Sequence, residues 1–212
     1  MPLKTFINLS EERQKVILNI CFEEFAQNDY DSASLSRIIS KLGLAKGSFY
    51  RYFENKKDLY FYLSEYAGKL IHVSFSKHLN ESGKDFFNDW IEFFLSFKEI
   101  EKEFPMLIRF RFKAASEKSS EIYQGSRRII RSEKTDFIKD AIKQYQEKGV
   151  IRKDIDITFV SLLMMYFNIA VSDYITTKYD IEKGDPVFSI QEDVLKNDVL
   201  SYIKIIKEGL QI

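Results

Sequence analysis

Basic side chains are concentrated in one short stretch of this 212-residue chain. Between Ser32 and Lys57 there are six basic residues and one acid, Glu54, which leaves a net charge of +5. The whole chain is neutral, with 32 basic and 32 acidic residues. The six basic residues are Arg37, Lys41, Lys46, Arg51, Lys56 and Lys57. A local positive field on a neutral protein suits one anionic partner at one face, so the pattern argues against general binding to polyanions.

Two short helices are expected to position these charges. The apolar residues of the first helix recur at helical spacing and are Leu35, Ile38, Ile39 and Leu42. A tight turn follows at Gly43, and the second helix is expected to begin near Ala45. Two short helices about a glycine turn form a helix-turn-helix, whose second helix can enter the major groove of DNA.

Eight residues in and around this unit are the predicted DNA contacts. They are Ser34, Arg37, Lys46, Gly47, Ser48, Tyr50, Arg51 and Lys56. Gly47 would allow close backbone approach, and Lys56 would meet a phosphate at a helix N-terminus. Phe49 and Phe53 are expected to point into a small three-helix core. The alternative is a solvated basic face on a helical bundle.

The pattern from roughly Val16 to Leu59 resembles the DNA-binding domain of the TetR family of bacterial transcriptional regulators. The matching residues are Phe25, Asp29-Tyr30, Ser34, Ile38-Ile39, Gly43-Leu44, Lys46-Gly47-Ser48-Phe49-Tyr50, Tyr52-Phe53 and Lys56-Lys57-Asp58-Leu59. Two positions depart from the family. Asp29 replaces a glycine that often needs a positive φ, and Ala45 replaces a serine that often caps the recognition helix.

Composition favours long helices throughout the chain. Glycine (8) and proline (3) are scarce, 45% of the residues are hydrophobic, and no stretch shows strand alternation with hairpin signals. We therefore predict an all-α fold of about nine helices. Residues 1–54 would form the helix-turn-helix DNA-binding domain, and residues 55–212 would form a helical effector-binding and dimerisation domain. The first helix is expected to begin after Ser10. After the two helices of the helix-turn-helix, further helices are expected over 55–79, 85–97, 105–112, 119–148, 156–179 and 189–210.

Aromatic residues cluster between Phe86 and Phe112. Such a cluster is either ordinary core or the wall of an apolar pocket, and the family resemblance implies a pocket for a small apolar or aromatic effector. The candidate ligand-binding residues are Trp90, Phe94, Phe97, Phe110, Tyr123, Met165, Tyr166 and Asn168. Asn168 interrupts an apolar helix, so its amide needs a partner, either a protein group or a ligand.

The last two long helices have wide apolar faces. They are expected at about Asp156–Tyr179 and Ser189–Leu210, and the resemblance implies that they pair with their copies in a homodimer. The family resemblance also implies that double-stranded operator DNA is the partner of the helix-turn-helix domain, which we call the head. The expected function is a sequence-specific DNA-binding regulator, a repressor released by its effector.

Other classes of function find less support in the sequence. No nucleophile motif or phosphate-cradling loop is present, so we expect no enzyme and no cofactor. His72 and His78 are six residues apart and lie on different helix faces, and Cys21 is the single cysteine, so no metal site is expected. No signal peptide is apparent, and the longest uncharged run is too short to span a bilayer. Both observations predict a cytoplasmic protein that does not bind a membrane. A helical adaptor protein that keeps the head, or an enzyme on a helical bundle, remains the alternative.

Overall fold

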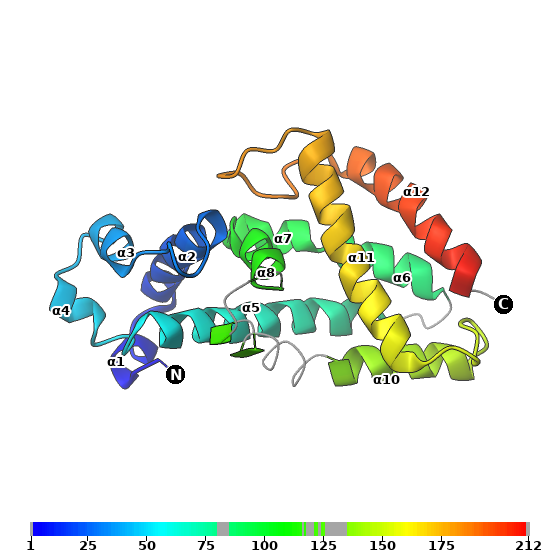
Figure 1. Ribbon diagram of the computed structural model, residues 1–212, viewed down its shortest axis with the longest axis horizontal. Helices are drawn as coiled ribbons and strands as arrows, with labels where there is room; N and C mark the ends of the chain where they lie inside the picture. Colours follow the sequence, from blue (N-terminus) through cyan, green and yellow to red (C-terminus); the bar gives the residue numbers. More distant parts are fainter. Residues whose placement is uncertain are drawn as a thin grey trace. The chain divides into compact units, whose positions relative to one another are not determined.

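The computed structural model describes residues 2–79, 85–115, 117, 121–122, 124–125 and 135–210 (Figure 1). The all-α prediction is confirmed, since these residues contain helices and no strand. The helices are α1 (Lys4–Ile7), α2 (Glu11–Gln27), α3 (Leu35–Lys41), α4 (Lys46–Phe49), α5 (Lys56–Leu79), α6 (Phe86–Leu95), α7 (Phe97–Glu103), α8 (Leu107–Ala115), α10 (Thr135–Glu147), α11 (Ile157–Lys178) and α12 (Glu192–Leu210).

The chain folds into two compact units. Unit 1 comprises Met1–Lys69, Ile100–Ile130 and Lys183–Pro186, and unit 2 comprises Leu70–Glu99, Arg131–Glu182 and Val187–Ile212. Unit 1 thus contains the whole helix-turn-helix region together with α8, and α5 contributes residues to both units. The predicted boundary after residue 54 separates two functional domains. It stays a prediction, because the two compact units are divided at other positions.

Side-chain caps fix the starts of the main helices. The Ser10 hydroxyl accepts from Arg13 N at the start of α2, and the Asp156 carboxylate accepts from Phe159 N at the start of α11. The Asn55 side chain accepts from Asp58 N at 2.9 Å, where α5 begins. These three helices begin within one residue of their predicted starts, because short polar side chains satisfy the first free N–H groups of a helix.

Other predicted bounds differ from the structure. The short helix α1 was not predicted; Phe6 fixes it, with its ring centroid 5.0 Å from that of Phe53. The last helix begins at Glu192 and not at Ser189. Of the single helix predicted over 119–148, α10 covers Thr135–Glu147, residues 121–122 and 124–125 are helical, and the remainder before residue 135 lies outside the described residues.

Positive φ angles occur at few described positions. Gly43 has φ +63° in the turn between α3 and α4, and Gly149 has φ +73° after α10, as their positions at helix ends predict. Asp180, at φ 48°, is the only other described residue with a positive φ and is not glycine. The strain expected at Asp29 is therefore absent, since α2 ends at an extended Asn28 and needs no left-handed residue.

Aromatic side chains form the core of unit 1. Phe22, Phe25 and Phe110 are buried, and Phe110 packs with ring centroids 5.3 Å from Phe22 and 6.4 Å from Phe25. Tyr60 on α5 lies 5.3 Å from Phe110. These contacts join α2, α5 and α8, so α2, which precedes the helix-turn-helix, shares one core with α8.

In unit 2, α12 packs along α6, and α11 packs against both α10 and α12. Among the described helices, α11 is the one long and apolar enough to cross a membrane, and 33% of its most apolar window is buried. A core helix of a water-soluble protein has the same length and composition, so this is weak support for a membrane span. The expectation of no membrane partner stays a prediction.

Candidate nucleic-acid interface

The short helix α4 is held by two phenylalanines. Phe49 and Phe53 are both fully buried, as predicted, and their ring centroids lie 6.0 Å apart. Ala45 precedes α4 and offers no side-chain cap, as its residue type predicts. The buried pair fixes which face of α4 points inward, and hence which residues point outward.

The outward face of this segment carries four of the predicted DNA contacts. Lys46, Gly47, Tyr50 and Arg51 are exposed, and Tyr50 keeps 40% of its surface accessible. Ser48 is half-buried. Neither Lys46 nor Arg51 forms an ion pair with a described side chain, so both cations are available to an external anion. Their contacts with DNA stay predictions.

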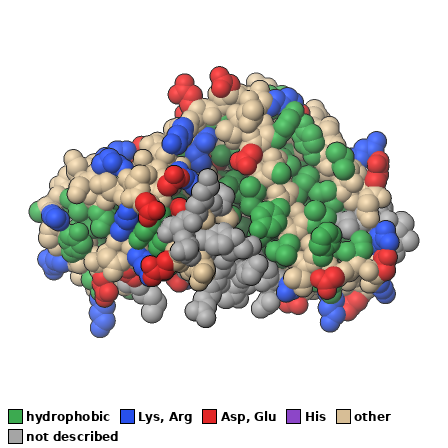
Figure 2. Space-filling model, viewed as in Figure 1, with side chains coloured by type: hydrophobic (Ala, Val, Ile, Leu, Met, Phe, Trp, Pro, Cys, Tyr) green, Lys and Arg blue, Asp and Glu red, His purple; other side chains and the backbone are tan. Residues whose placement is uncertain are grey.

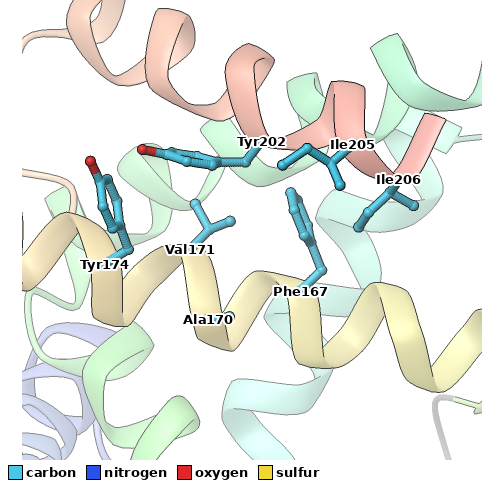
Figure 3. Close-up of a pocket in the computed structure, with 7 residues that line it drawn as sticks. All are labelled: Phe167, Ala170, Val171, Tyr174, Tyr202, Ile205 and Ile206. Carbon is cyan, nitrogen blue, oxygen red and sulfur yellow. The ribbon is translucent and has the colours of Figure 1, made fainter. Parts of the chain in front are cut away.

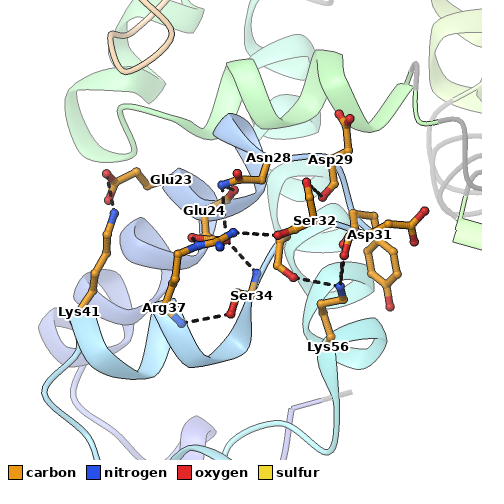
Figure 4. Close-up of polar contacts among 12 residues, drawn as sticks. Glu23, Glu24, Asn28, Asp29, Asp31, Ser32, Ser34, Arg37, Lys41 and Lys56 are labelled. Atoms are coloured by element: carbon orange, nitrogen blue, oxygen red, sulfur yellow. Dashed lines mark hydrogen bonds and ion pairs between the residues drawn. The ribbon is translucent and has the colours of Figure 1, made fainter.

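Arg37 is already engaged within unit 1 (Figure 4). Its Nη2 donates to Glu24 Oε1 at 2.6 Å and to the Ser32 carbonyl at 2.8 Å, and its Nε donates to Glu24 Oε1 at 3.0 Å. The hydrogen bond with Glu24 raises the pKa of Arg37 further. Ser34, also a predicted contact, caps α3 by accepting from Arg37 N at 3.4 Å. Both residues therefore shape the head, and their DNA contacts stay predictions.

Glu24 is the buried centre of this network. Its side chain is 3% exposed, whereas that of Arg37 is 51% exposed. Besides Arg37, Glu24 Oε1 accepts from the Ser34 backbone N–H at 2.8 Å. One carboxylate thus joins α2 to the start of α3, a role that its sequence position gave no sign of.

Glu24→Ala is expected to lower the free energy of unfolding by about 1–3 kcal/mol, because the Ser34 N–H loses its acceptor. The figure is smaller than for a fully buried ion pair, since the half-exposed guanidinium of Arg37 regains water. Urea unfolding measures it. Glu23→Ala is the control: Glu23 pairs with Lys41 at 2.9 Å on the surface, and its loss should cost less than about 1 kcal/mol. Equal losses for the two variants would contradict the assigned role of Glu24.

Lys56, a predicted phosphate contact, is engaged within unit 1, and its contact with DNA stays a prediction. Its Nζ donates to the carbonyl oxygens of Tyr30 at 2.7 Å, Ala33 at 3.0 Å and Asp31 at 3.2 Å (Figure 4). An ammonium has three donors, and these carbonyls use all of them. The loop between α2 and α3 turns its carbonyls toward the start of α5, where Lys56 is the adjacent cation. Lys56 therefore fastens this loop to α5.

Lys56→Met should lower the free energy of unfolding by about 1.5–3 kcal/mol, because three hydrogen bonds to a charged group are lost and partly buried carbonyls are left without that donor. Denaturant midpoints give the value. Lys57→Met is the matched control, since Lys57 forms an exposed ion pair with Glu121 and should contribute less than about 1 kcal/mol. A Lys56 variant as stable as the Lys57 variant would refute the fastening role.

Two contacts within unit 1 link the α2–α3 loop to α8 and the chain that follows it. Lys113 Nζ lies 3.1 Å from Asp29 Oδ1, and the Tyr30 N–H donates to Glu117 Oε2 at 3.1 Å. The residues of each pair are more than eighty positions apart. No local spacing signals such contacts, so sequence reasoning missed them.

The predicted ligand-binding residues are distributed over both units. Trp90 and Asn168 meet in unit 2, where Trp90 Nε1 donates to Asn168 Oδ1 at 2.9 Å. Phe94 and Phe97, a few residues after Trp90 in the sequence, are also buried, and their ring centroids lie 5.6 Å apart. Phe110 belongs to the core of unit 1. The other three are Met165, which is half-buried, Tyr166, which is exposed, and Tyr123, which lies outside the described residues.

An apolar groove lies between α11 and α12 (Figure 3). It has a volume of about 270 Å³ and is lined by Phe167, Ala170, Val171, Tyr174, Tyr202, Ile205 and Ile206. Ile205 is 72% exposed, and hydrophobic side chains gather over α11 in the space-filling view (Figure 2). Lys178 Nζ and the Tyr179 hydroxyl both donate to Asp198 at 2.7 Å and join the two helices beside this groove.

Metal chemistry finds no site in the part of the chain that the structure describes. No three His, Cys, Asp or Glu side chains come together there. Cys21 is buried on α2, and burial raises the pKa of its thiol. A buried, protonated thiol is a poor ligand and a poor nucleophile, so Cys21 is a packing residue.

Comparisons with known proteins agree with this arrangement. The sequence model of the tetR family of bacterial regulatory proteins matches residues 17–63. The structure is similar to a TetR-family transcriptional regulator from Chloroflexus aurantiacus, with 24% identity, a TM-score of 0.70 and coverage of 100% of this chain and 99% of that one. No curated protein matches the chain.

Two further solved structures share the fold at lower identity. A TetR-family protein from Syntrophomonas wolfei has 21% identity and a TM-score of 0.68, covering 96% of this chain and 99% of its own. The fatty acid degradation regulator FadR from Bacillus halodurans has 16% identity and a TM-score of 0.64, covering 87% and 96%. At these identities the likeness shows the fold.

This all-helical chain, with its outward-facing helix-turn-helix, has the fold of helix-turn-helix transcriptional regulators. Residues 17–63 match the sequence model of the tetR family of bacterial regulatory proteins, and the chain as a whole has the fold of the TetR-family structures. The resemblance predicted over Val16 to Leu59 is thereby confirmed.

Proposed function

We propose that this regulator is a homodimeric repressor that binds double-stranded operator DNA and leaves it when a small effector binds. The proposal rests on the difference between the two faces of the α4 segment. Phe49 and Phe53 are buried inward, while Lys46, Tyr50 and Arg51 face outward without ion-pair partners among the described residues. A helix of this kind docks in a major groove, with cations on phosphates and polar groups on base edges. The protein acts on DNA in the cytoplasm.

The dimer forms through α11 and α12 of each copy. These helices carry exposed apolar side chains, and the groove between them is lined by apolar and aromatic residues. Covering this surface with the same surface of a second copy gives a two-fold four-helix bundle. Two recognition helices then face two half-sites related by a dyad, about 34–36 Å apart.

The effector acts on the head through unit 1. The contacts of Lys113 with Asp29 and of Glu117 with Tyr30 support this route, because they join α8 and its continuation to the loop before α3. A coupling of about 1–3 kcal/mol suffices for a useful switch. The effector is a small molecule with an apolar or aromatic body, in keeping with the aromatic cores of both units.

Selection of bound fragments from a random DNA pool tests the proposal. The dimer should enrich an inverted repeat with half-sites one helical turn apart, or a multiple of it. Enrichment of no sequence would refute sequence-specific binding and favour a protein-binding adaptor that keeps the head. Enrichment of single half-sites would refute the dimer alone.

A further inference from the structure

Arg111 on α8 has a buried guanidinium nitrogen that no described residue satisfies. Its Nη1 is closed to solvent and has no hydrogen-bond partner, although the residue as a whole keeps some exposure. The other two cations of α8 are both engaged. Arg109 donates from Nε and Nη2 to the Asp185 carbonyl at 3.2 and 3.1 Å, and Lys113 pairs with Asp29 at 3.1 Å. Arg111 is thus the exception on its own helix.

A buried guanidinium nitrogen without a hydrogen-bond partner normally weakens a fold. Burial lowers the pKa of Arg111 to about 10, so the group stays protonated at neutral pH and does not escape its desolvation by losing the proton. Removing such a charge from water without a partner is unfavourable, and proteins almost always pair it. A charge retained in this position suggests a partner that comes from outside the chain.

The surroundings of Arg111 define what that partner is. Among the described residues, the almost fully buried Tyr60 is close enough for its phenol to act on the charge of Arg111. Tyr60 packs between the rings of Phe25, at 5.1 Å, and Phe110, at 5.3 Å. A guanidinium binds planar oxyanions through two parallel hydrogen bonds, and the aromatic cluster that Tyr60 joins favours an apolar body over a hydrated one.

We propose that Arg111 binds the carboxylate of an amphiphilic organic acid, and that this acid is the effector of the regulator. This inference rests on the proposed function and names the chemical class of the effector, which becomes an apolar molecule with one anionic head. Arg111 also lies two residues before Lys113, so a ligand that reorients this part of α8 acts directly on the ion pair with Asp29. Binding at Arg111 and release of DNA are then connected within unit 1.

Thermal unfolding with decanoate and decanol tests the site, because the two probes share a chain and differ in charge. Decanoate at ten times its Kd should raise the melting temperature of the wild-type protein by about 3–5 °C, and decanol should not. Arg111→Met should lose the response to decanoate while melting, without ligand, at the same or a higher temperature. Arg109→Met, which removes a satisfied cation from the same helix, should keep the response.

A second readout connects the site to DNA. Decanoate should weaken binding of the wild-type protein to the selected operator by at least about fivefold and should leave binding by Arg111→Met unchanged. An equal decanoate shift in wild-type and Arg111→Met proteins, or no shift in the wild type, would overturn the assignment of Arg111. The DNA selection requires no effector, so its outcome separates failure of this inference from failure of the proposed function.

Discussion

Replacing Lys46 and Arg51 together by alanine is expected to reduce operator affinity about 100-fold or more, because each lost contact is worth about 1–3 kcal/mol. Both side chains are exposed and neither is paired with a described residue, so truncation creates no cavity and breaks no internal ion pair. The melting temperature and the dimer mass should therefore stay unchanged. Fluorescence anisotropy on the selected operator measures the loss.

The control for this variant is Lys153→Ala with Lys183→Ala. Both lysines are exposed, and their removal changes the net charge by the same amount. This control should bind the operator almost normally. The slope of log affinity against log salt should fall by about 1 for each phosphate contact removed in the Lys46 and Arg51 variant only. Equal losses of operator affinity in both double variants would mean that only the net charge matters. Unfolding of the Lys46 and Arg51 variant would mean that these residues stabilise the fold.

Ile205→Asp is expected to convert the dimer to a monomer and to reduce operator affinity by about 100-fold or more, because a buried unpaired carboxylate costs several kcal/mol at the subunit contact. Ile205 lines the groove between α11 and α12 and is 72% exposed in the single chain. Its replacement should therefore not weaken the fold of the monomer. Light scattering gives the mass, and anisotropy gives the affinity.

Val73→Asp is the matched control for Ile205→Asp. Val73 lies on α5 and is exposed to nearly the same degree, at 69%, but it does not line the groove. This variant should remain dimeric and bind operator normally. A dimer that survives Ile205→Asp, or one that Val73→Asp breaks equally well, would place the subunit contact elsewhere.

Local sequence signals were sufficient for the framework of the helix-turn-helix domain and for the starts of several helices. The helices α2, α5 and α11 begin within one residue of their predicted starts, where Ser10, Asn55 and Asp156 act on N–H groups within three residues. Phe49 and Phe53 are buried as the helical spacing predicts. Charge clustering indicated which face of the head remains outside.

Contacts between distant segments could not be predicted in the same way. Lys56 has the residue type and position of a phosphate ligand, and only the folded α2–α3 loop shows that its three donors are used by carbonyls. Glu24 was one acid among many on a helix until α3 packed over it. The sequence could not show that Arg111 Nη1 lacks a hydrogen-bond partner, because residue spacing does not reveal which groups surround a side chain in the fold.

The entry of the α4 segment into a major groove is tested most directly by dimethyl sulfate footprinting of the selected operator. The reagent methylates guanine N7 in the major groove and adenine N3 in the minor groove, so it reports the two grooves separately. We expect protection of guanine N7 in both half-sites, lost when Lys46 and Arg51 are replaced by alanine. Protection confined to adenine N3, or guanine protection that persists in the double variant, would contradict the placement of this helix on DNA.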